Sequence, residues 1–207
     1  MITAIQALER LADGNRRFVN GEFDADSQAR RTHQPGQSGG QAPFAIILAC
    51  SDSRVPVEMV FDAGFGDLFV IRVAGNIVAP SQIGSIEFAA EQFGCPLVIV
   101  LGHTHCGAVS ATLDELVLKE SLRSPNLRAI VDRVRPAVEP VLKAHGGRAS
   151  EAALKESVRS NIRASVERLS HGSLILEKLI DAGELTIVGA EYSIETGGVE
   201  FFRESAR

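Results

Sequence analysis

The sequence predicts an α/β fold in which helices flank a central, mostly parallel β-sheet, with an extended N-terminal helical arm and a C-terminal hairpin. Between residues 44 and 120, short apolar runs of the buried-strand type alternate with helical segments. This alternation is typical of parallel sheets that helices cover on both faces. The 207 residues, 45% of them hydrophobic and 23% charged, suffice for one core of ordinary globular composition. We therefore expect a single domain over 1–207, with 1–40 as arm and linker and 41–207 as the α/β core.

The first element is expected to be a helix over residues 3–19, because Thr3 and Gln6 have capping-box spacing and apolar residues recur at helical intervals. Residues 20–43 are polar and rich in Gly, Ser and Gln, which is typical of a long connection. The helix is therefore expected to stand apart from the body of the protein.

The middle of the chain is expected to supply the parallel strands and the helices between them. The strands are predicted at "FAIILA" (44–49), "LFVIRVA" (68–74) and "PLVIVLG" (96–102). The helices are predicted at "PVEMVFDAG" (56–64), "GSIEFAAEQFG" (84–94) and "CGAVSATLDELVLKE" (106–120). Pro56 suits the first turn of a helix.

The last third of the chain is expected to be helical and then to end in a hairpin. Residues 126–145 and 150–183 have amphipathic helical patterns. Pro136 and Pro140 should kink or interrupt the first of these helices. Residues 184–202 have the pattern of two strands joined by a turn at "ETGG".

Composition and charge exclude several classes of function. The net charge of −5 leaves no basic face for sequence-independent nucleic-acid binding. The apolar runs are too short to cross a bilayer, and the N-terminus lacks the pattern of a secretory signal. Three cysteines, an odd number, do not make a disulfide framework. Thiols kept for a metal or for chemistry in a reducing compartment are the better interpretation, and a cytoplasmic protein is expected.

Chemistry-bearing side chains follow two of the predicted strands. Cys50 ends the first strand, His103 ends the third, and Cys106 begins the next helix. Open parallel sheets bind ligands at the carboxyl ends of their strands, so these three residues should meet at one edge. Each alone is more often structural, but together they are the ligand types that zinc prefers. Three protein ligands also leave a fourth position for water, as catalytic zinc sites do.

Opposite charges follow Cys50 at once, at Asp52 and Arg54. The sequence "SDSR" alone is typical of a turn or helix cap with a solvated ion pair. Arg72 is a cation within a predicted strand, and a structural salt bridge at a subunit interface is expected for it, with contact to an anion as the alternative and Glu87 as a candidate partner.

Four motifs, "ACSDSRVPVE", "GDLFVIRVAGNIV", "GSIEFA" and "VLGHTHCGAV", resemble in their order and spacing the β-class carbonic anhydrases. The resemblance continues to "GAEYSIETGGVEFF" and so covers nearly the whole chain. It implies zinc-dependent, reversible hydration of carbon dioxide to bicarbonate and a proton. It also implies one zinc ion per subunit on Cys50, His103 and Cys106, with attack by zinc-bound hydroxide on carbon dioxide and with Asp52 and Arg54 as a catalytic dyad.

The resemblance gives Asp52 two possible positions: paired with Arg54, or on zinc as a fourth ligand that blocks catalysis. An unpaired buried carboxylate is costly, so Asp52 should hold one or the other. Two thiolates neutralise the charge of the metal, and zinc-bound water should then be less acidic than on three histidines. We therefore expect the activity to rise towards alkaline pH.

Further substrate contacts are implied by the same resemblance. They are Gln41 as a hydrogen-bonding group, Phe69, Ala74 and Phe88 as walls, and the backbone amide of Gly107 as a donor to bound anion. In the family a neighbouring subunit supplies part of these walls, which implies a homodimer or homotetramer. The chain departs from the family at Phe88, where tyrosine is common, and at Val73, where asparagine is common. It also has no tryptophan, so the tryptophan-containing bicarbonate site of one subgroup cannot be present as such.

Three alternative functions are compatible with some of these residues. A related zinc hydrolase would act on carbonyl sulfide or carbon disulfide with identical ligands. A non-catalytic zinc module would close the coordination sphere with Asp52 or Cys95. A phosphatase with Cys50 as nucleophile is disfavoured, because such a site needs an arginine six residues after the cysteine and Arg54 is only four after.

Overall fold

The computed structural model describes residues 2–23, 40–118 and 124–202, and it contains a five-stranded sheet of order β2-β1-β3-β4-β5. The strands are β1 (Ala45–Ala49), β2 (Leu68–Arg72), β3 (Leu97–His103), β4 (Thr186–Tyr192) and β5 (Val199–Phe201). Strands β1 to β4 pair with one another in parallel, and β5 pairs with β4 in the antiparallel direction. This confirms the predicted fold class and the C-terminal hairpin.

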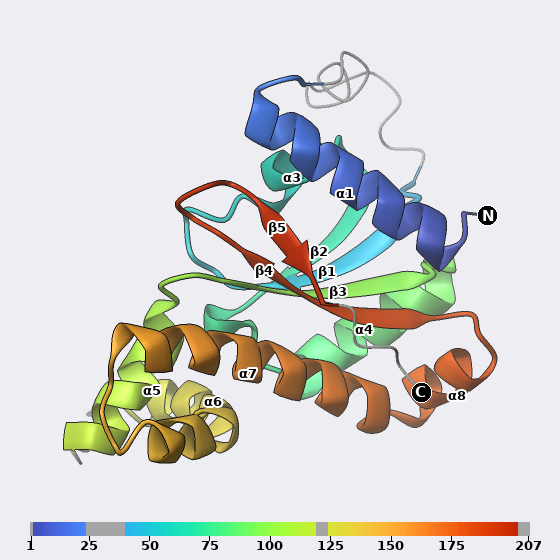
Figure 1. Ribbon diagram of the computed structural model, residues 1–207. Coiled ribbons are helices and arrows are strands. Elements are labelled where there is room, and N and C mark those ends of the chain that lie inside the picture. Colours follow the sequence, from blue (N-terminus) through green and yellow to red (C-terminus); the bar gives the residue numbers. More distant parts are fainter. Residues whose placement is uncertain (1, 24–39, 119–123, 203–207) are drawn as a thin grey trace.

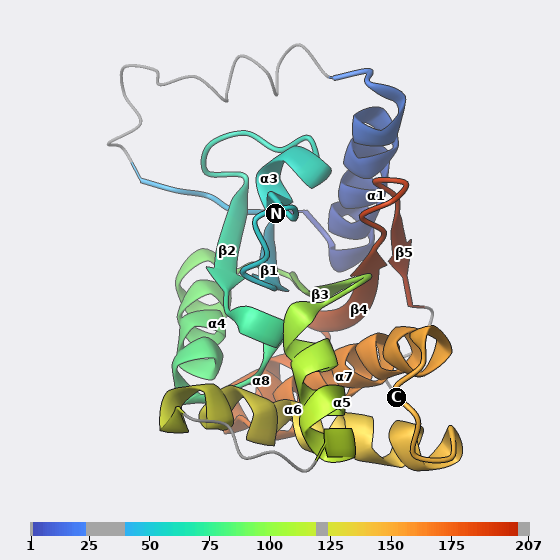
Figure 2. The ribbon, with the colours of Figure 1, turned by 90° about the vertical axis from the view of Figure 1, so that its left-hand side faces the viewer.

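Helices lie on both faces of this sheet, in unequal numbers (Figures 1 and 2). They are α1 (Ala4–Asn20), α3 (Val57–Val60), α4 (Pro80–Phe93), α5 (Gly107–Leu118), α6 (Pro125–Ala144), α7 (Glu151–His171) and α8 (Leu174–Asp181), with a short 3₁₀ helix η2 (Ala74–Asn76). Helices α1 and α3 cover one face, and α4 to α8 pack on the other. None of the described helices is long and apolar enough to span a membrane.

Strand β1 shows why the apolar runs are continuous. Ile46 and Leu48 point into the core beneath the larger group of helices, whereas Ile47 points into the core beneath α1 and α3. Side chains alternate between the two faces of a strand, and here both faces are covered. Every residue of β1 and β3 is consequently buried.

Helix α1 begins with the predicted capping box at Thr3 and Gln6, but it does not stand apart from the body. Its Ala7 and Leu11 are fully buried against the sheet. Asn15 is buried as well: its amide donates to the carbonyls of Val60 (3.1 Å) and Gly197 (2.9 Å). The apolar face of the helix is therefore used within its own chain.

The last helices differ from the prediction in two places. Helix α6 is not interrupted at Pro136 and Pro140, because the packing of its buried face between α5 and α7 offsets the cost of the two prolines. The helical stretch predicted over 150–183 is divided into α7 and α8, where the Ser173 hydroxyl accepts from the amide of Leu176 and starts a new helix.

Candidate metal centre

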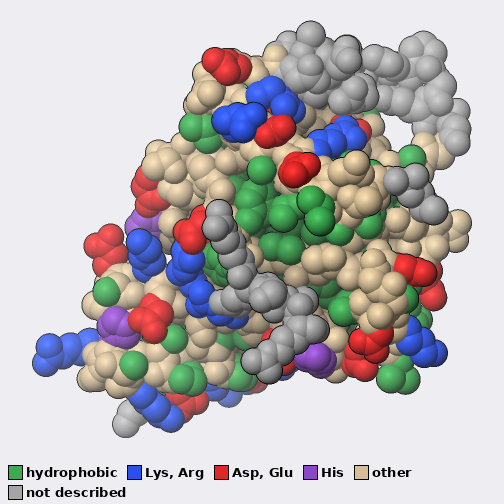
Figure 3. Space-filling model, turned by 45° about the vertical axis from the view of Figure 1, so that its right-hand side comes forward, with side chains coloured by type: hydrophobic (Ala, Val, Ile, Leu, Met, Phe, Trp, Pro, Cys, Tyr) green, Lys and Arg blue, Asp and Glu red, His purple; other side chains and the backbone are tan. Residues whose placement is uncertain are grey.

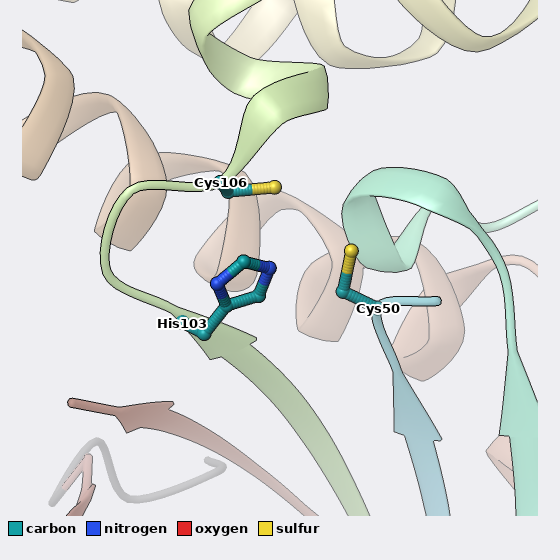
Figure 4. Close-up of side chains that lie close together, drawn as sticks. All are labelled: Cys50, His103 and Cys106. Atoms are coloured by element: carbon teal, nitrogen blue, oxygen red, sulfur yellow. The ribbon is translucent and has the colours of Figure 1, made fainter. Parts of the chain in front are cut away.

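Cys50, His103 and Cys106 meet at the carboxyl ends of two neighbouring strands (Figure 4). Cys50 follows β1 directly, His103 is the last residue of β3, and Cys106 directly precedes α5. All three are buried, and their ligand atoms lie within 4.8 Å of one another. Chain segments more than 50 residues apart are thus brought together by the parallel pairing of β1 with β3.

The imidazole of His103 is oriented for a metal ion. Its Nδ1 donates to the backbone carbonyl of Thr104 over 2.8 Å, so Nε2 carries the free lone pair. This Nε2 is fully buried and has no hydrogen-bond partner. Buried polar atoms are rarely left without a partner, and a cation between Nε2 and two thiolates supplies one. A sulfur, nitrogen and sulfur donor set is one that zinc favours, so the residues fit this metal.

The two thiols of the cluster differ in acidity. The pKa of Cys50 falls to about 4, chiefly because the Cys106 thiol donates a hydrogen bond to its sulfur, and burial only partly opposes this. The backbone amide of Gly75 also approaches the Cys50 sulfur, at 3.4 Å. The pKa of Cys106 is raised by the same hydrogen bond and by burial. A thiolate is the form that binds metal, so Cys50 is already prepared as a ligand.

Asp52 and Arg54 form a bidentate ion pair beside the cluster. Arg54 Nε donates to Asp52 Oδ1 over 2.9 Å and Nη2 donates to Oδ2 over 2.8 Å. This guanidinium holds the pKa of the Asp52 carboxyl well below its usual range. Asp52 Oδ2 nevertheless lies only 3.9 Å from His103 Nε2. Of the two positions that the sequence leaves open, the structure has the carboxylate on Arg54, at the margin of the cluster.

Arg72 belongs to the site in a way that the sequence analysis missed. Its Nε donates to the carbonyl of Cys50 over 3.1 Å and its Nη2 to the carbonyl of Asp52 over 2.6 Å. The expected salt bridge with Glu87 is not formed, because Glu87 accepts from the Ser173 hydroxyl at 2.6 Å. Ala49 and Arg72 are partners in the parallel pairing of β1 and β2. The register of β1 against β2 is what would have placed Arg72 beside Cys50.

The five further contacts implied by the resemblance lie in different places. Gly107 is exposed at the first position of α5, and Ala74 lies in η2 next to the glycine that contacts Cys50. Gln41 is exposed and precedes β1, so it lies at the opposite end of that strand from Cys50. Phe69 and Phe88 pack on each other, with ring centroids 6.3 Å apart, at the β2 edge of the sheet.

Comparisons with known proteins agree on one family. A family model described as carbonic anhydrase matches residues 45–199. Carbonic anhydrase 2 of Mycobacterium tuberculosis is 37% identical over 193 residues, covering 93% of this chain and 90% of the relative. A carbonic anhydrase of Mycolicibacterium smegmatis is 37% identical over 196 residues, covering 95% of this chain and 92% of the relative.

Solved structures give the same result at the level of the fold. The β-carbonic anhydrase CcaA superposes with a TM-score of 0.73 and 28% identity, over 97% of this chain and 93% of that one. A β-carbonic anhydrase of Coccomyxa, solved in complex with acetazolamide, superposes with a TM-score of 0.72 and 25% identity, over 93% of this chain and 85% of that one.

Proposed function

The chain belongs to the β-carbonic anhydrase family, and from this premise we propose that it is a zinc enzyme that hydrates carbon dioxide reversibly to bicarbonate and a proton. The observation that carries the proposal is the buried Nε2 of His103, which has no hydrogen-bond partner and lies between two thiols. Cys50, His103 and Cys106 would hold one zinc ion per subunit. When bound, zinc lowers the pKa of a coordinated water molecule and so supplies a nucleophile near neutral pH.

Asp52 and Arg54 are proposed to orient the reaction. The Asp52 carboxylate is ionised because Arg54 lowers its pKa, so it can only accept hydrogen bonds. With the metal bound, a carboxylate at this place would accept a hydrogen bond from its water molecule and so orient that water towards carbon dioxide. Arg54 keeps the carboxylate off the metal position by holding both of its oxygens. Arg72 supports this arrangement, since it binds the backbone carbonyls of Cys50 and Asp52, on either side of Ser51.

Binding of the anionic product is assigned to the start of α5. The amide of Gly107 is the first of the helix and has no partner within it, and a helix N-terminus favours negative charge. Ala74, Phe69 and Phe88 remain candidates for the apolar wall that a small apolar substrate needs. Because Gln41 lies at the far end of β1 from the ligands, its proposed contact with substrate is made in the site of a neighbouring subunit.

A homo-oligomer, dimer or tetramer, is accordingly part of the proposal. β2 is an edge strand of the sheet, and Phe88 beside it is 53% exposed. Elsewhere on the molecule, on the side of α1 and the β4–β5 hairpin, Figure 3 shows another group of hydrophobic side chains with charged side chains around it. Contiguous exposed apolar area of this kind marks interaction surfaces. The cysteines are free thiols, which supports a reducing compartment, and we propose the cytoplasm.

The test is zinc content together with stopped-flow hydration of carbon dioxide, on the wild type, Cys50→Ser and Cys95→Ser. The wild type should hold one zinc ion per subunit and be active, and Cys50→Ser should lose most of both. Cys95→Ser is the matched control, because Cys95 is buried but donates to the carbonyl of Pro43 (3.0 Å) away from the cluster.

An active wild type without zinc, or an unaffected Cys50→Ser, would show the proposed site to be wrong. A folded wild type that holds zinc without hydrating carbon dioxide would instead indicate a non-catalytic zinc module. Faster turnover of carbonyl sulfide or carbon disulfide than of carbon dioxide would assign the site to that related reaction.

A further inference from the structure

Thr104 and His105 form a short loop between the ligands His103 and Cys106. His105 has a φ of +56°, in the left-handed region that residues other than glycine adopt only rarely. The carbonyl of Thr104 accepts the hydrogen bond from Nδ1 of His103 that turns Nε2 towards the thiols. The conformation of this short loop therefore sets both the spacing of two ligands and the orientation of one of them.

Glu195, in the turn between β4 and β5, holds this loop from outside. Its carboxylate accepts from the Thr104 hydroxyl (2.8 Å), from the Ser193 hydroxyl (3.0 Å) and from Nε2 of His105. The Thr104 hydroxyl in turn accepts from the amide of Ile194 (3.1 Å). Three donors thus converge on one carboxylate, and two of them come from the loop between the ligands.

This arrangement is more than an exposed ion pair. His105 and Glu195 are each about half exposed, and a single exposed pair contributes little to stability. Glu195, however, also binds Thr104, whose amide donates to the carbonyl of Tyr192 at the end of β4 (3.0 Å). The pKa of Glu195 falls to about 2, first because of its own backbone amide and then because of the Thr104 and Ser193 hydroxyls. The carboxylate is therefore ionised throughout the neutral range.

We infer that Glu195 is a positioning residue of the metal centre: it holds His105 in the left-handed conformation and Thr104 in place, and so fixes His103 and Cys106 for the metal ion. The inference rests on the proposed function, because it requires that the cluster binds zinc. Partners of metal ligands typically change metal affinity by about 10- to 100-fold when removed. Glu195 acts one step further out, and an effect of roughly 10-fold is expected.

The experiment measures zinc release from the loaded protein to an excess of chelator. Glu195→Ala should release zinc roughly 10-fold faster than the wild type, and Glu195→Gln, which keeps an acceptor oxygen, should lie between the two. With Co²⁺ in place of zinc, Glu195→Ala should also show a changed visible absorption spectrum, because that spectrum reports the geometry of the ligands. Circular dichroism checks that each variant is folded.

The decisive variant adds His105→Gly to Glu195→Ala. Glycine adopts a φ of +56° without steric cost, so the double variant should recover most of the slow release and the wild-type cobalt spectrum. Glu156→Ala is the matched control, since Glu156 pairs with His145 (2.9 Å) on the surface of other helices and should leave zinc release unchanged.

Two results would overturn the inference: Glu195→Ala that releases zinc as slowly as the wild type, or equal acceleration in Glu195→Ala and Glu156→Ala. Failure of the double variant to recover would show that Glu195 does not act through the backbone of His105. A wild type that binds no zinc would contradict the proposed function itself, and the inference with it.

Discussion

At the scale of single residues, the Asp52 carboxylate is bound by Arg54 but lies close to the metal ligand His103. Arg54 binds both of its oxygens, while His103 Nε2 lies only 3.9 Å from one of them. A carboxylate without Arg54 would be a partly buried charge next to a metal site, and it would either take up a proton or move to the cation. Either change would remove the acceptor that orients water.

We predict that Arg54→Gln lowers carbon dioxide hydration by roughly 100-fold, the lower end of the range typical for loss of a positioned proton-handling group. Arg54 depresses the pKa of Asp52, so the wild-type carboxylate stays ionised as the pH falls to about 4 and below. Without Arg54 nothing holds both oxygens of the carboxylate, so the hydration rate should fall across the whole pH range. The measurement is stopped-flow hydration between pH 5 and 9.

The control is Arg54→Lys, which keeps the charge without the bidentate geometry and should lose less activity. The same pair also affects stability: a depressed pKa stabilises the folded state above the usual carboxyl pKa, and this contribution is lost as the pH falls below it. A hydration rate that is unchanged in Arg54→Gln would contradict the assigned role of the pair.

At the scale of the elements, the sequence predicted the strands and the residues at their carboxyl ends best. The run "FAIILA" is apolar throughout because both faces of β1 are covered, and the cysteine after it lies at the ligand-binding edge of any parallel sheet. Cys50, His103 and Cys106 could be grouped on that ground alone. The position of α1, the unbroken α6 and the loop contacts of Glu195 depend on tertiary packing, which no local pattern in the chain reports.

The docking of α1 depends on a glycine. A Cβ on Gly14 would lie 2.0 Å from the backbone carbonyl oxygen of Phe61. A backbone atom cannot move away as the end of a flexible side chain can. We predict that Gly14→Ala destabilises the protein by about 1–3 kcal/mol through overpacking, even though alanine favours the helix itself. Urea denaturation followed by circular dichroism measures this change.

Gly84→Ala is the matched substitution in α4. Nothing lies within 4 Å of a Cβ at Gly84, so only the helix preference of alanine remains and the protein should gain about 0.5–1 kcal/mol. Equal effects of the two substitutions would show that α1 is not in close contact with the segment at Phe61.

At the scale of the whole molecule, the described residues include an apolar region at the β2 edge of the sheet that its own helices leave partly open. The aromatic cluster of Phe69, Phe88 and Phe93 has ring centroids 5.6–6.3 Å apart and lies at the edge strand β2. In the proposed oligomer a second copy of the chain covers this edge, and the site of each subunit receives Gln41 from the neighbouring subunit.

We predict that Phe88→Glu shifts the protein from an oligomer towards the monomer, because a charge would be buried at the interface without a partner. Hydration activity should fall together with the mass, since each site would lose the neighbouring Gln41. Light scattering coupled to size-exclusion chromatography gives the mass. Leu174→Glu, at a site 76% exposed on α8, should change neither, and a Phe88→Glu oligomer of unchanged mass would exclude this edge as the interface.

The buried amide of Asn15 has a consequence for synthesis of the chain. Besides its bonds to Val60 and Gly197, Asn15 accepts from the amide of Val199, 184 residues later in the chain. At about 5–20 residues per second, the ribosome adds that hairpin roughly 10–40 s after the first helix. The three metal-ligand residues, Cys50, His103 and Cys106, are synthesised long before then. The hydrogen bonds of Asn15 to Gly197 and Val199 therefore complete the docking of α1 only after the final hairpin has emerged.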